Sequence, residues 1–335
     1  MKIRSKLLLS VIIIASVVFI ASIGYLTKKL NTITLKNSFS LADAIAGENA
    51  NLIKASLTAE MGMARSMANS LADFRELHEK QRIENSNRIM KNIATQNPQF
   101  LSVWCSWELG AIDASYKKPY GRISLTYYRD NGNLKYSAEY KNMEGDILNS
   151  SYYLLKTSKK EAVNDPYYYT YPGSSITVLE TSVCIPLLDG EKFVGLWGFD
   201  FELSHYQAQI NKIKPFEGCY AMLLSQNSSI VAHTNKKFVG QTFDSIYPVE
   251  NKKFGVLKNV LDGKSFSARF TDSKTKIEYY ATFSSFAIEN TENPWTLALF
   301  VPTNVLLKET NAVTSNSYIV IIIGLFILIV VIWII

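Results

Sequence analysis

Two long uncharged apolar runs, one near each end of the 335-residue chain, place the strongest constraint on its fold. Leu7–Leu26 is mostly Leu, Ile, Val and Ala, and Tyr318–Ile335 is a second run that is richer in Ile and Val. A helix needs about 20 such residues to cross about 30 Å of hydrocarbon. In lipid the backbone polar groups must bond within the segment, so each run must be helical. The sequence therefore predicts transmembrane helices at residues 7–27 and 315–335.

The residues beside the first run predict its orientation. Three basic residues precede it and place residues 1–6 in the cytoplasm, although Lys28 and Lys29 on the other side weaken this bias. The residues between the spans then lie outside the cytoplasm, in a two-span protein of the cell (inner) membrane. The alternative is a cleaved signal peptide, but the apolar run exceeds the usual core of about 7–15 residues and no clear A-x-A site follows. Because no soluble domain follows Ile335, we expect this sequence to be part of a longer protein.

Composition and motif content exclude several classes of function. The net charge of +6 is spread thinly and no Lys/Arg run reaches five residues, so nucleic-acid binding has no support. The three cysteines are far apart and odd in number, which predicts buried thiols and no disulfide framework. The three histidines do not cluster with cysteines or acids, and no hydrolase, metalloprotease or phosphate-loop motif occurs. We therefore expect no metal, no cofactor and no enzymatic activity.

Residues 28–97 are predicted to form one continuous helix that serves signalling and dimerisation. The stretch lacks proline until Pro98, which pushes the preceding residue out of the helical conformation. About 70 helical residues would span roughly 100 Å, which is more than one small domain can bury. We therefore expect the helix to pack partly on its own domain and partly on a second copy, giving a homodimer. Its apolar stripe is predicted to contain Leu41, Ile45, Leu52, Ala55, Ala59, Met63, Met67, Leu71 and Phe74.

From Phe100 onward, short runs rich in Val, Ile, Thr, Tyr and Phe alternate with turn residues. Asp130–Asn133 and Asp189-Gly190 each join two such runs and predict β-hairpins. A similar series of strands follows the helix-like stretch at 205–214. The pattern predicts an α+β fold with two antiparallel-sheet modules. The modules occupy residues 98–204 and 205–314, and their strands are predicted at 124–128, 134–140, 176–188, 193–201, 219–224, 230–233, 265–270, 277–283 and 295–301.

Several local segments carry a resemblance to a known family. In the first module they are Ser106–Leu109 with Ala111–Asp113, Tyr120–Arg122 with Tyr127–Arg129, Tyr152–Leu155, Lys159–Glu161, Asp165–Tyr169 and Phe193–Asp200, and in the second they are Ala221–His233 and Trp295–Pro302. With the order of anchor, long helix, two sheet modules and second anchor, the chain resembles the double Cache sensor domains of bacterial chemoreceptors and sensor kinases. The resemblance implies two PAS-like (Cache) modules, a ligand site in the membrane-distal one, and signalling across the membrane. Chemotaxis is the expected output, with a histidine kinase or another output as the alternative.

Tyrosines crowd the distal module. Twelve of the 19 tyrosines fall between Tyr116 and Tyr171, more than a small core needs. A tyrosine offers a flat apolar face and a hydroxyl that needs a partner when buried. Several rings around one acid form a cage suited to an ammonium or a flat polar ligand. Asp200 supplies the acid, since a carboxylate within the apolar run Val194–Phe201 is costly to bury unpaired. Alternatively, Asp200 ends its strand facing water or caps a turn.

The resemblance also bears on the ligand class. Amino-acid-binding members of the family grip the ligand carboxylate with an arginine two residues before an aromatic, and the matching position here is Ser150, before Tyr152. Serine cannot form the two-pronged charged pair that arginine makes. A second acid of that pattern, two residues past a tyrosine, is replaced by Tyr169, which follows Tyr167. We therefore expect a small amine, a quaternary ammonium or a nitrogen heterocycle. The alternatives are an amino acid, or a partner-binding ectodomain with no small ligand.

The other candidate residues leave alternatives open. Arg122 either meets an anionic part of the ligand or pairs with Glu108 or Asp113 as a structural bridge. Trp107 either stacks on the ligand or fills the core. Tyr127 and Tyr128 are neighbours on a strand, so only one of them can face the pocket. The predicted ligand-binding set is Trp107, Arg122, Tyr127, Tyr152, Tyr153, Tyr167, Tyr169 and Asp200.

Overall fold

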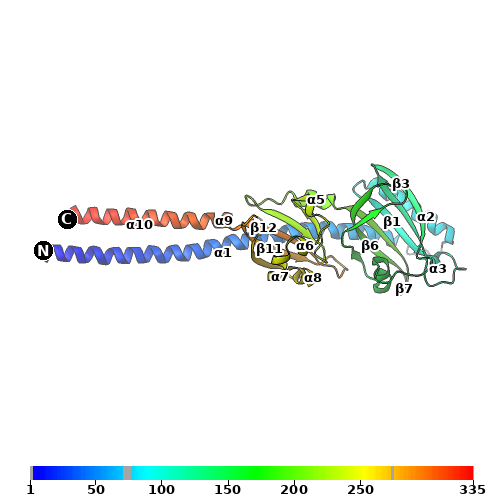
Figure 1. Cartoon of the computed structure of the whole chain (residues 1–335), viewed down its shortest axis with the longest axis horizontal. Helices are drawn as coiled ribbons and strands as arrows, with labels where there is room; N and C mark the ends of the chain where they lie inside the picture. The colour runs from blue at the N-terminus through cyan, green and yellow to red at the C-terminus, as the bar shows by residue number, and fades with distance from the viewer. Residues whose placement is uncertain (1–2, 71–76, 273–274, 335) are drawn as a thin grey trace.

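The computed structural model describes residues 3–70, 77–272 and 275–334. The molecule is elongated, with both chain ends together and the two β-sheets following one another along a single long helix (Figure 1). That helix, α1 (Ile3–Asn69), spans about 100 Å at 1.5 Å per residue. A second long helix, α10 (Lys308–Ile334), lies beside its first half. The α+β architecture predicted from the sequence is confirmed.

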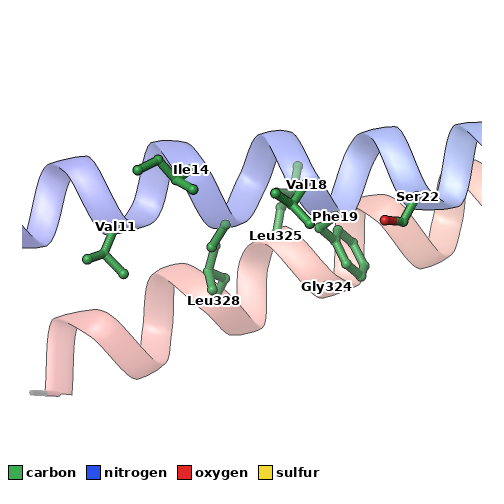
Figure 2. A pocket seen from close by; sticks show the side chains of 9 residues that line it. Val11, Ile14, Val18, Phe19, Ser22, Gly324, Leu325 and Leu328 are labelled. Carbon is green, nitrogen blue, oxygen red and sulfur yellow. The ribbon is translucent and has the colours of Figure 1, made fainter.

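The paired parts of α1 and α10 contain the two apolar runs. Each is long and apolar enough, by length and composition, to cross a membrane. Figure 2 shows the Phe19 ring lying against Gly324, where an added side chain would collide with that ring. Nearer the sheets, the Asn31 side chain donates a hydrogen bond to Thr314 Oγ1 at 2.7 Å. The space of about 610 Å³ between the helices is lined almost wholly by apolar side chains, so it suits lipid chains better than a polar ligand.

The distal sheet, which lies further from the two apolar helix segments, has seven strands in the order β3-β2-β1-β7-β6-β4, with β5 also pairing with β6. Every pairing is antiparallel. Both hairpins predicted in this module are confirmed. In the first, Asn131 and Gly132 take positive φ angles of 51° and 79°, which suit the twist of a two-residue turn. The elements are β1 (Ser102–Glu108), α3 (Leu109–Ile112), β2 (Arg122–Asp130), β3 (Asn133–Lys141), α4 (Ser151–Ser158), β4 (Ala162–Val163), β5 (Tyr167–Thr170), β6 (Thr177–Asp189) and β7 (Lys192–Glu202).

The proximal sheet, which lies nearer to the two apolar helix segments, has five strands in the order β10-β11-β12-β8-β9, again antiparallel. The strands predicted for this half of the chain all form, within a few residues at their ends. The elements are α5 (Ser204–Ile210), β8 (Tyr220–Leu224), β9 (Ile230–His233), η2 (Lys236–Phe238), α6 (Phe243–Ile246), α7 (Pro248–Phe254), α8 (Val256–Leu261), β10 (Phe266–Thr271), β11 (Glu278–Phe286), β12 (Trp295–Pro302) and α9 (Thr303–Leu306).

The prediction of one continuous helix over 28–97 is wrong. α1 ends at Asn69, and a separate helix, α2 (Glu79–Gln96), lies on the distal sheet beside it. α1 contacts β6 and β7, whereas α2 contacts β1 and β2. A helix about 10 Å wide covers only about two strands that lie about 4.8 Å apart. The wide distal sheet therefore needs the second helix to bury its apolar face.

The buried face of α1 lies one residue away from the predicted stripe. Most of the side chains in contact with the sheets are small, so the strands approach the helix closely, whereas the prediction followed the larger side chains. The buried residues are Ala42, Ala46, Ala50, Ile53, Leu57, Met61, Ala64 and Ala68. Of the predicted set, Leu41 and Leu52 are 53% and 63% exposed, Ala55 and Ala59 are exposed, Ile45, Met63 and Met67 are half-buried, and Leu71 and Phe74 lie outside the described residues.

Candidate functional site

A cavity of about 150 Å³ lies in the distal module. Strands β1, β2, β6 and β7 form its base, and α4 and β5 form its walls. A cavity of about this volume holds a molecule the size of benzene, with roughly six non-hydrogen atoms. The lining residues are Trp104, Arg122, Ser124, Thr126, Ser151, Tyr152, Leu155, Asn164, Tyr167, Tyr169, Tyr171, Glu180, Ser182, Cys184, Leu196 and Asp200.

Strand alternation decides which side chains of β1 and β2 reach the cavity, because successive side chains point to opposite faces. Trp104 lines the cavity, so Trp107 faces the helices: it is fully buried, and its Nε1 donates to Ser86 Oγ of α2 at 3.1 Å. Tyr127 packs into the same core and against Tyr136, with ring centroids 4.8 Å apart. Trp107 and Tyr127 therefore do not line the cavity, contrary to the prediction.

Helix α4 presents one of its two adjacent tyrosines to the cavity. Ser150 Oγ accepts a hydrogen bond from the backbone N–H of Tyr153 at 3.2 Å and so caps the start of the helix. Tyr152 lines the cavity, and Tyr153, one position further round the helix, does not, contrary to the prediction. Ser150 stands where the resemblance led us to expect an arginine in amino-acid-binding members. In this structure the Ser150 side chain caps α4 and does not line the cavity.

Asp200 lies at one end of the cavity and is only 3% exposed, so it does not face bulk solvent. Four side chains donate hydrogen bonds to its carboxylate: Ser102 Oγ, Trp104 Nε1 at 2.8 Å, the Tyr171 hydroxyl at 2.9 Å and Ser182 Oγ at 2.7 Å. Burial raises the pKa of Asp200, and these four donors oppose that shift. Asp200 is thus brought into the cavity as predicted, but its oxygens are already well bonded.

A second buried acid, Glu180 on β6, was not predicted. It is fully buried, and its Oε2 lies 2.8 Å from the Tyr171 hydroxyl oxygen. Within the described residues, Oε1 has no hydrogen-bond partner. Burial, and then the negative charge of Asp200, raise the pKa of Glu180 to about 9. The sequence did hold a signal for this residue, because Glu180 is a lone acid inside a strand-like run, as Asp200 is.

The tyrosines at the acidic end form a connected cluster. Tyr167 and Tyr169 share one face of β5, as predicted, with ring centroids 6.3 Å apart. The Tyr167 hydroxyl lies 2.6 Å from Ser182 Oγ, and burial followed by the charge of Asp200 raises its pKa, so this hydroxyl stays neutral. Tyr171, which was not predicted, stacks on Tyr128 with ring centroids 4.7 Å apart. Tyr128, and not Tyr127, therefore belongs to this side of the sheet.

Arg122 approaches the cavity from the other end of β1. Its Nη1 donates to Ser106 Oγ at 2.8 Å, and its guanidinium carbon lies 3.9 Å from the centroid of the Tyr152 ring. Glu108 does not pair with it: that carboxylate is bonded by the Tyr152 hydroxyl and by Lys156 Nζ at 2.9 Å. Burial lowers the pKa of Arg122, but an arginine stays charged in proteins. The cavity therefore has an acidic end and a basic end.

The lining suits binding better than covalent chemistry. Cys184 lines the cavity, but burial and the nearby charge of Asp200 raise its pKa, so it is a neutral thiol and a poor nucleophile. The described residues contain no group of three or more His, Cys, Asp or Glu placed to hold a metal ion. What the cavity offers is a set of aromatic faces between fixed charges of opposite sign.

No protein-family model and no curated protein matches the sequence. Solved structures do match. The extracellular domain assigned to the histidine kinase mmHK1S-Z2 aligns with a TM-score of 0.64 at 22% identity, over 81% of this chain and 99% of that domain. The periplasmic sensory domain of the Campylobacter jejuni chemoreceptor Tlp1 aligns with a TM-score of 0.62 at 18% identity, over 82% of this chain and 98% of that domain. The chain has the fold of these sensor domains.

A third structure carries a ligand. The ligand-binding domain of the Pseudomonas fluorescens chemoreceptor CtaA, solved with L-isoleucine, aligns with a TM-score of 0.54 at 13% identity, over 82% of this chain and 96% of that domain. At these identities the likeness extends to the fold alone. The sensor fold predicted from the resemblance to double Cache domains is thereby confirmed.

Proposed function

We propose that the chain is the sensing region of a transmembrane receptor, and that its distal cavity binds a small, positively charged nitrogen compound. The observation that carries the proposal is the acidic end of the cavity. There Glu180 and Asp200, both buried, lie among aromatic side chains in a space of about 150 Å³. The proposal assigns the chain a binding role and no catalytic one.

The chemistry of the acidic end favours a cation. A buried negative charge is costly unless a positive group compensates it, and an ammonium group does so directly. Trp104, Tyr167 and Tyr169 add ring faces, and a cation over such a face gains about 2 kcal/mol when it is desolvated. The cavity volume suits a ligand of about six non-hydrogen atoms. A simple amine or a small quaternary ammonium meets these conditions.

One observation favours an amino acid as the second candidate. Arg122 lies across the cavity from Asp200, and within the described residues its Nε has no hydrogen-bond partner. An amino acid could place its carboxylate at Arg122 and its ammonium group at the two acids, and it would then contact both ends of the cavity. The volume of the cavity would limit such a ligand to the smallest amino acids.

A ligand screen separates these candidates. The full chain, reconstituted in lipid nanodiscs, would be heated with millimolar small amines, small amino acids or simple carboxylates. We expect the amines to raise the melting temperature, because a ligand that binds only the folded state stabilises it. Stabilisation by amino acids alone would replace the proposal with the second candidate. Stabilisation by carboxylates alone would reject both, and no effect from any compound would favour an ectodomain that binds a partner protein.

For the signal, we propose that the residues between the two apolar segments lie outside the cytoplasm and that α1 and α10 cross the membrane. α1 packs on both sheets, so a change in the distal sheet reaches the proximal one through it. The modules also touch directly, through a Lys160–Glu292 ion pair and a hydrogen bond from the Asn227 N–H to Asp165 Oδ1 at 3.2 Å. Such coupling requires that the ligand bind one of two conformations more tightly. We propose a chemotaxis output, with a histidine kinase as the alternative.

We further propose that two copies associate through α1. The helix leaves an apolar stripe exposed on the side away from the sheets, including Leu41, Leu52, Ala55 and Ala59. Light scattering of the full chain in detergent tests this. Leu52→Asp should shift the protein toward a monomer, whereas Asn51→Asp, an exposed neighbour outside the stripe, should not. Equal masses for the two variants would contradict this mode of association.

A further inference from the structure

The hydroxyl of Tyr171 lies between the two buried acids of the cavity. Its oxygen is 2.8 Å from Glu180 Oε2 and 2.9 Å from Asp200 Oδ2. A phenol has one proton, so Tyr171 can donate to only one of the two carboxyl groups. In the other contact, either the carboxyl group donates its own proton to the Tyr171 oxygen or no hydrogen bond forms.

The other partners of each acid decide the direction. Asp200 accepts from Ser102, Trp104 and Ser182 as well as Tyr171, which is the surrounding of an ionised carboxylate. Glu180 lies beside two tyrosine hydroxyls, those of Tyr171 at 2.8 Å and of Tyr167, and its Oε1 lacks a hydrogen-bond partner among the described residues. An ionised Glu180 would be a buried charge beside a like charge with few donors, which is strongly unfavourable. A proton on Glu180 lets Glu180 donate to Tyr171 while Tyr171 donates to Asp200.

We propose that the empty cavity holds one proton on Glu180, and that a cationic ligand displaces this proton when it binds. This inference rests on the proposed function, because it assumes a positively charged ligand. In the exchange, the Glu180 O–H bond breaks, the proton leaves for the solvent, and the ligand cation takes its place beside the new carboxylate. The net charge at the acidic end stays the same before and after binding. Glu180, and not the already saturated Asp200, becomes the acid that meets the ligand.

The surroundings of Glu180 support this assignment. Burial, and then the charge of Asp200, raise its pKa to about 9, which keeps the proton in place at neutral pH. Within the described residues no positive side chain hydrogen-bonds or ion-pairs with Glu180. The titratable and charged groups on the strands around it are Tyr167 on β5, Tyr171 after β5, Cys184 on β6, Asp200 and Glu202 on β7, and Arg122 on β2. On α1, Arg65 is paired with Glu161. Glu60, also on α1, accepts a hydrogen bond from the Tyr206 hydroxyl and lies 3.4 Å from His205 Nε2.

The exchange makes binding depend on pH in a fixed direction. Below pH about 9 a cation must displace the proton, so its apparent affinity should rise by up to about tenfold for each pH unit. Above that pH the affinity should level off, because Glu180 is already ionised. Tetramethylammonium is the suitable probe: it fits the cavity, and it carries no proton of its own to confuse the measurement.

Calorimetry of the full chain in nanodiscs tests the proposal, with tetramethylammonium titrated at pH 7 in buffers that differ in ionisation enthalpy. The wild-type protein should release close to one proton for each cation bound. Glu180→Gln should bind without releasing a proton. Glu202→Gln is the matched control, because Glu202 lies opposite Glu180 on β7 but is exposed, and it should behave as the wild type. Binding without proton release, or release that persists in Glu180→Gln, would overturn the proposal and leave the proposed function standing.

If no cation binds, infrared spectroscopy tests the proton on Glu180 separately from the proposed binding function. Infrared spectra of the ligand-free protein at pH 7 should contain the C=O stretch of a buried, protonated carboxyl group, and Glu180→Gln should lack it. Its absence from the wild type would refute the proton on Glu180. Its presence without any cation binding would refute the proposed function and, with it, the exchange.

Discussion

The two sheet modules are built alike but differ on one face. In both, α1 packs against the sheet. In the proximal module a group of buried aromatic rings fills the interior beside the strands, and these include Phe243, Phe270, Phe283 and Phe300. In the distal module the corresponding interior contains a polar cavity with two acids. Sheets that both pack on α1 therefore enclose a solid core in one module and a polar cavity in the other.

Two residues of one strand illustrate the difference. β7 and β12 are both almost entirely buried strands. β7, however, carries Gly198 and Asp200. Gly198 leaves room for the Trp104 ring, since a side chain at this position would collide with it. The glycine and the acid of β7 thus contribute an aromatic face and a carboxylate to the cavity.

The largest loss of stability at a single pH is expected from a substitution in the aromatic core of the proximal module. Phe283→Ala should lower the free energy of unfolding by about 3–5 kcal/mol, because it opens a cavity in close-packed aromatic surroundings. Phe283 stacks on Phe266, with ring centroids 4.4 Å apart, and is 1% exposed. Chemical denaturation would measure the loss, and calorimetry at a temperature where the variant is folded should show unchanged cation affinity. Lost affinity in the folded variant would mean that the proximal core shapes the binding site.

A smaller effect on stability, combined with lost binding, is expected in the distal module. Asp200→Asn keeps the shape of the side chain but turns one acceptor into a donor, which leaves neighbouring donors unpaired. We expect a loss of about 1–3 kcal/mol in stability and at least tenfold in cation affinity. Asp262→Asn, at an exposed position of the proximal module, is the control and should change neither. Full cation affinity in Asp200→Asn would show that the charge of Asp200 is irrelevant to the ligand.

The last expected effect is a change in the pH dependence of stability. Because the folded-state pKa of Glu180 lies near 9, above the usual value for a glutamate, its contribution to stability is fully present below about pH 4.5 and is lost as the pH rises through 9. Glu180→Gln removes this contribution. Denaturation curves recorded from pH 5 to 9 should therefore fall less steeply with pH for the variant than for the wild type. Parallel pH profiles would indicate that Glu180 is ionised in the folded protein.

Local signals in the sequence predicted the strands well. Asn131-Gly132 and Asp189-Gly190 mark hairpins because only a few residues accept the backbone angles of tight turns. Asp200 was identified because an acid within an apolar run needs a reason to be buried. The same argument applied to Glu180 would have found the second acid. Both conclusions depend on residues close together in the chain.

The errors concern packing between distant segments. Trp107 was expected in the cavity in place of Trp104, because a one-residue change of phase moves every side chain of a strand to the other face. The buried face of α1 was misplaced because alanines at close contacts, such as Ala46, carry little hydrophobic signal. The break between α1 and α2 follows from the width of a sheet whose strands come later in the chain. Each of these features depends on contacts between segments far apart in the sequence, so composition and periodicity could not predict them.

The most direct test of the central claim compares a cation with an uncharged molecule of the same shape. Choline and its carbon analogue dimethylbutanol differ only in the atom that bears the charge. In calorimetric titrations of the full chain, choline should bind at least tenfold more tightly, and that preference should disappear when both acids are removed in the Glu180→Gln/Asp200→Asn double variant. Equal affinities for the two compounds in the wild-type protein would show that the distal cavity selects size and apolar surface, and would contradict a cation-sensing site.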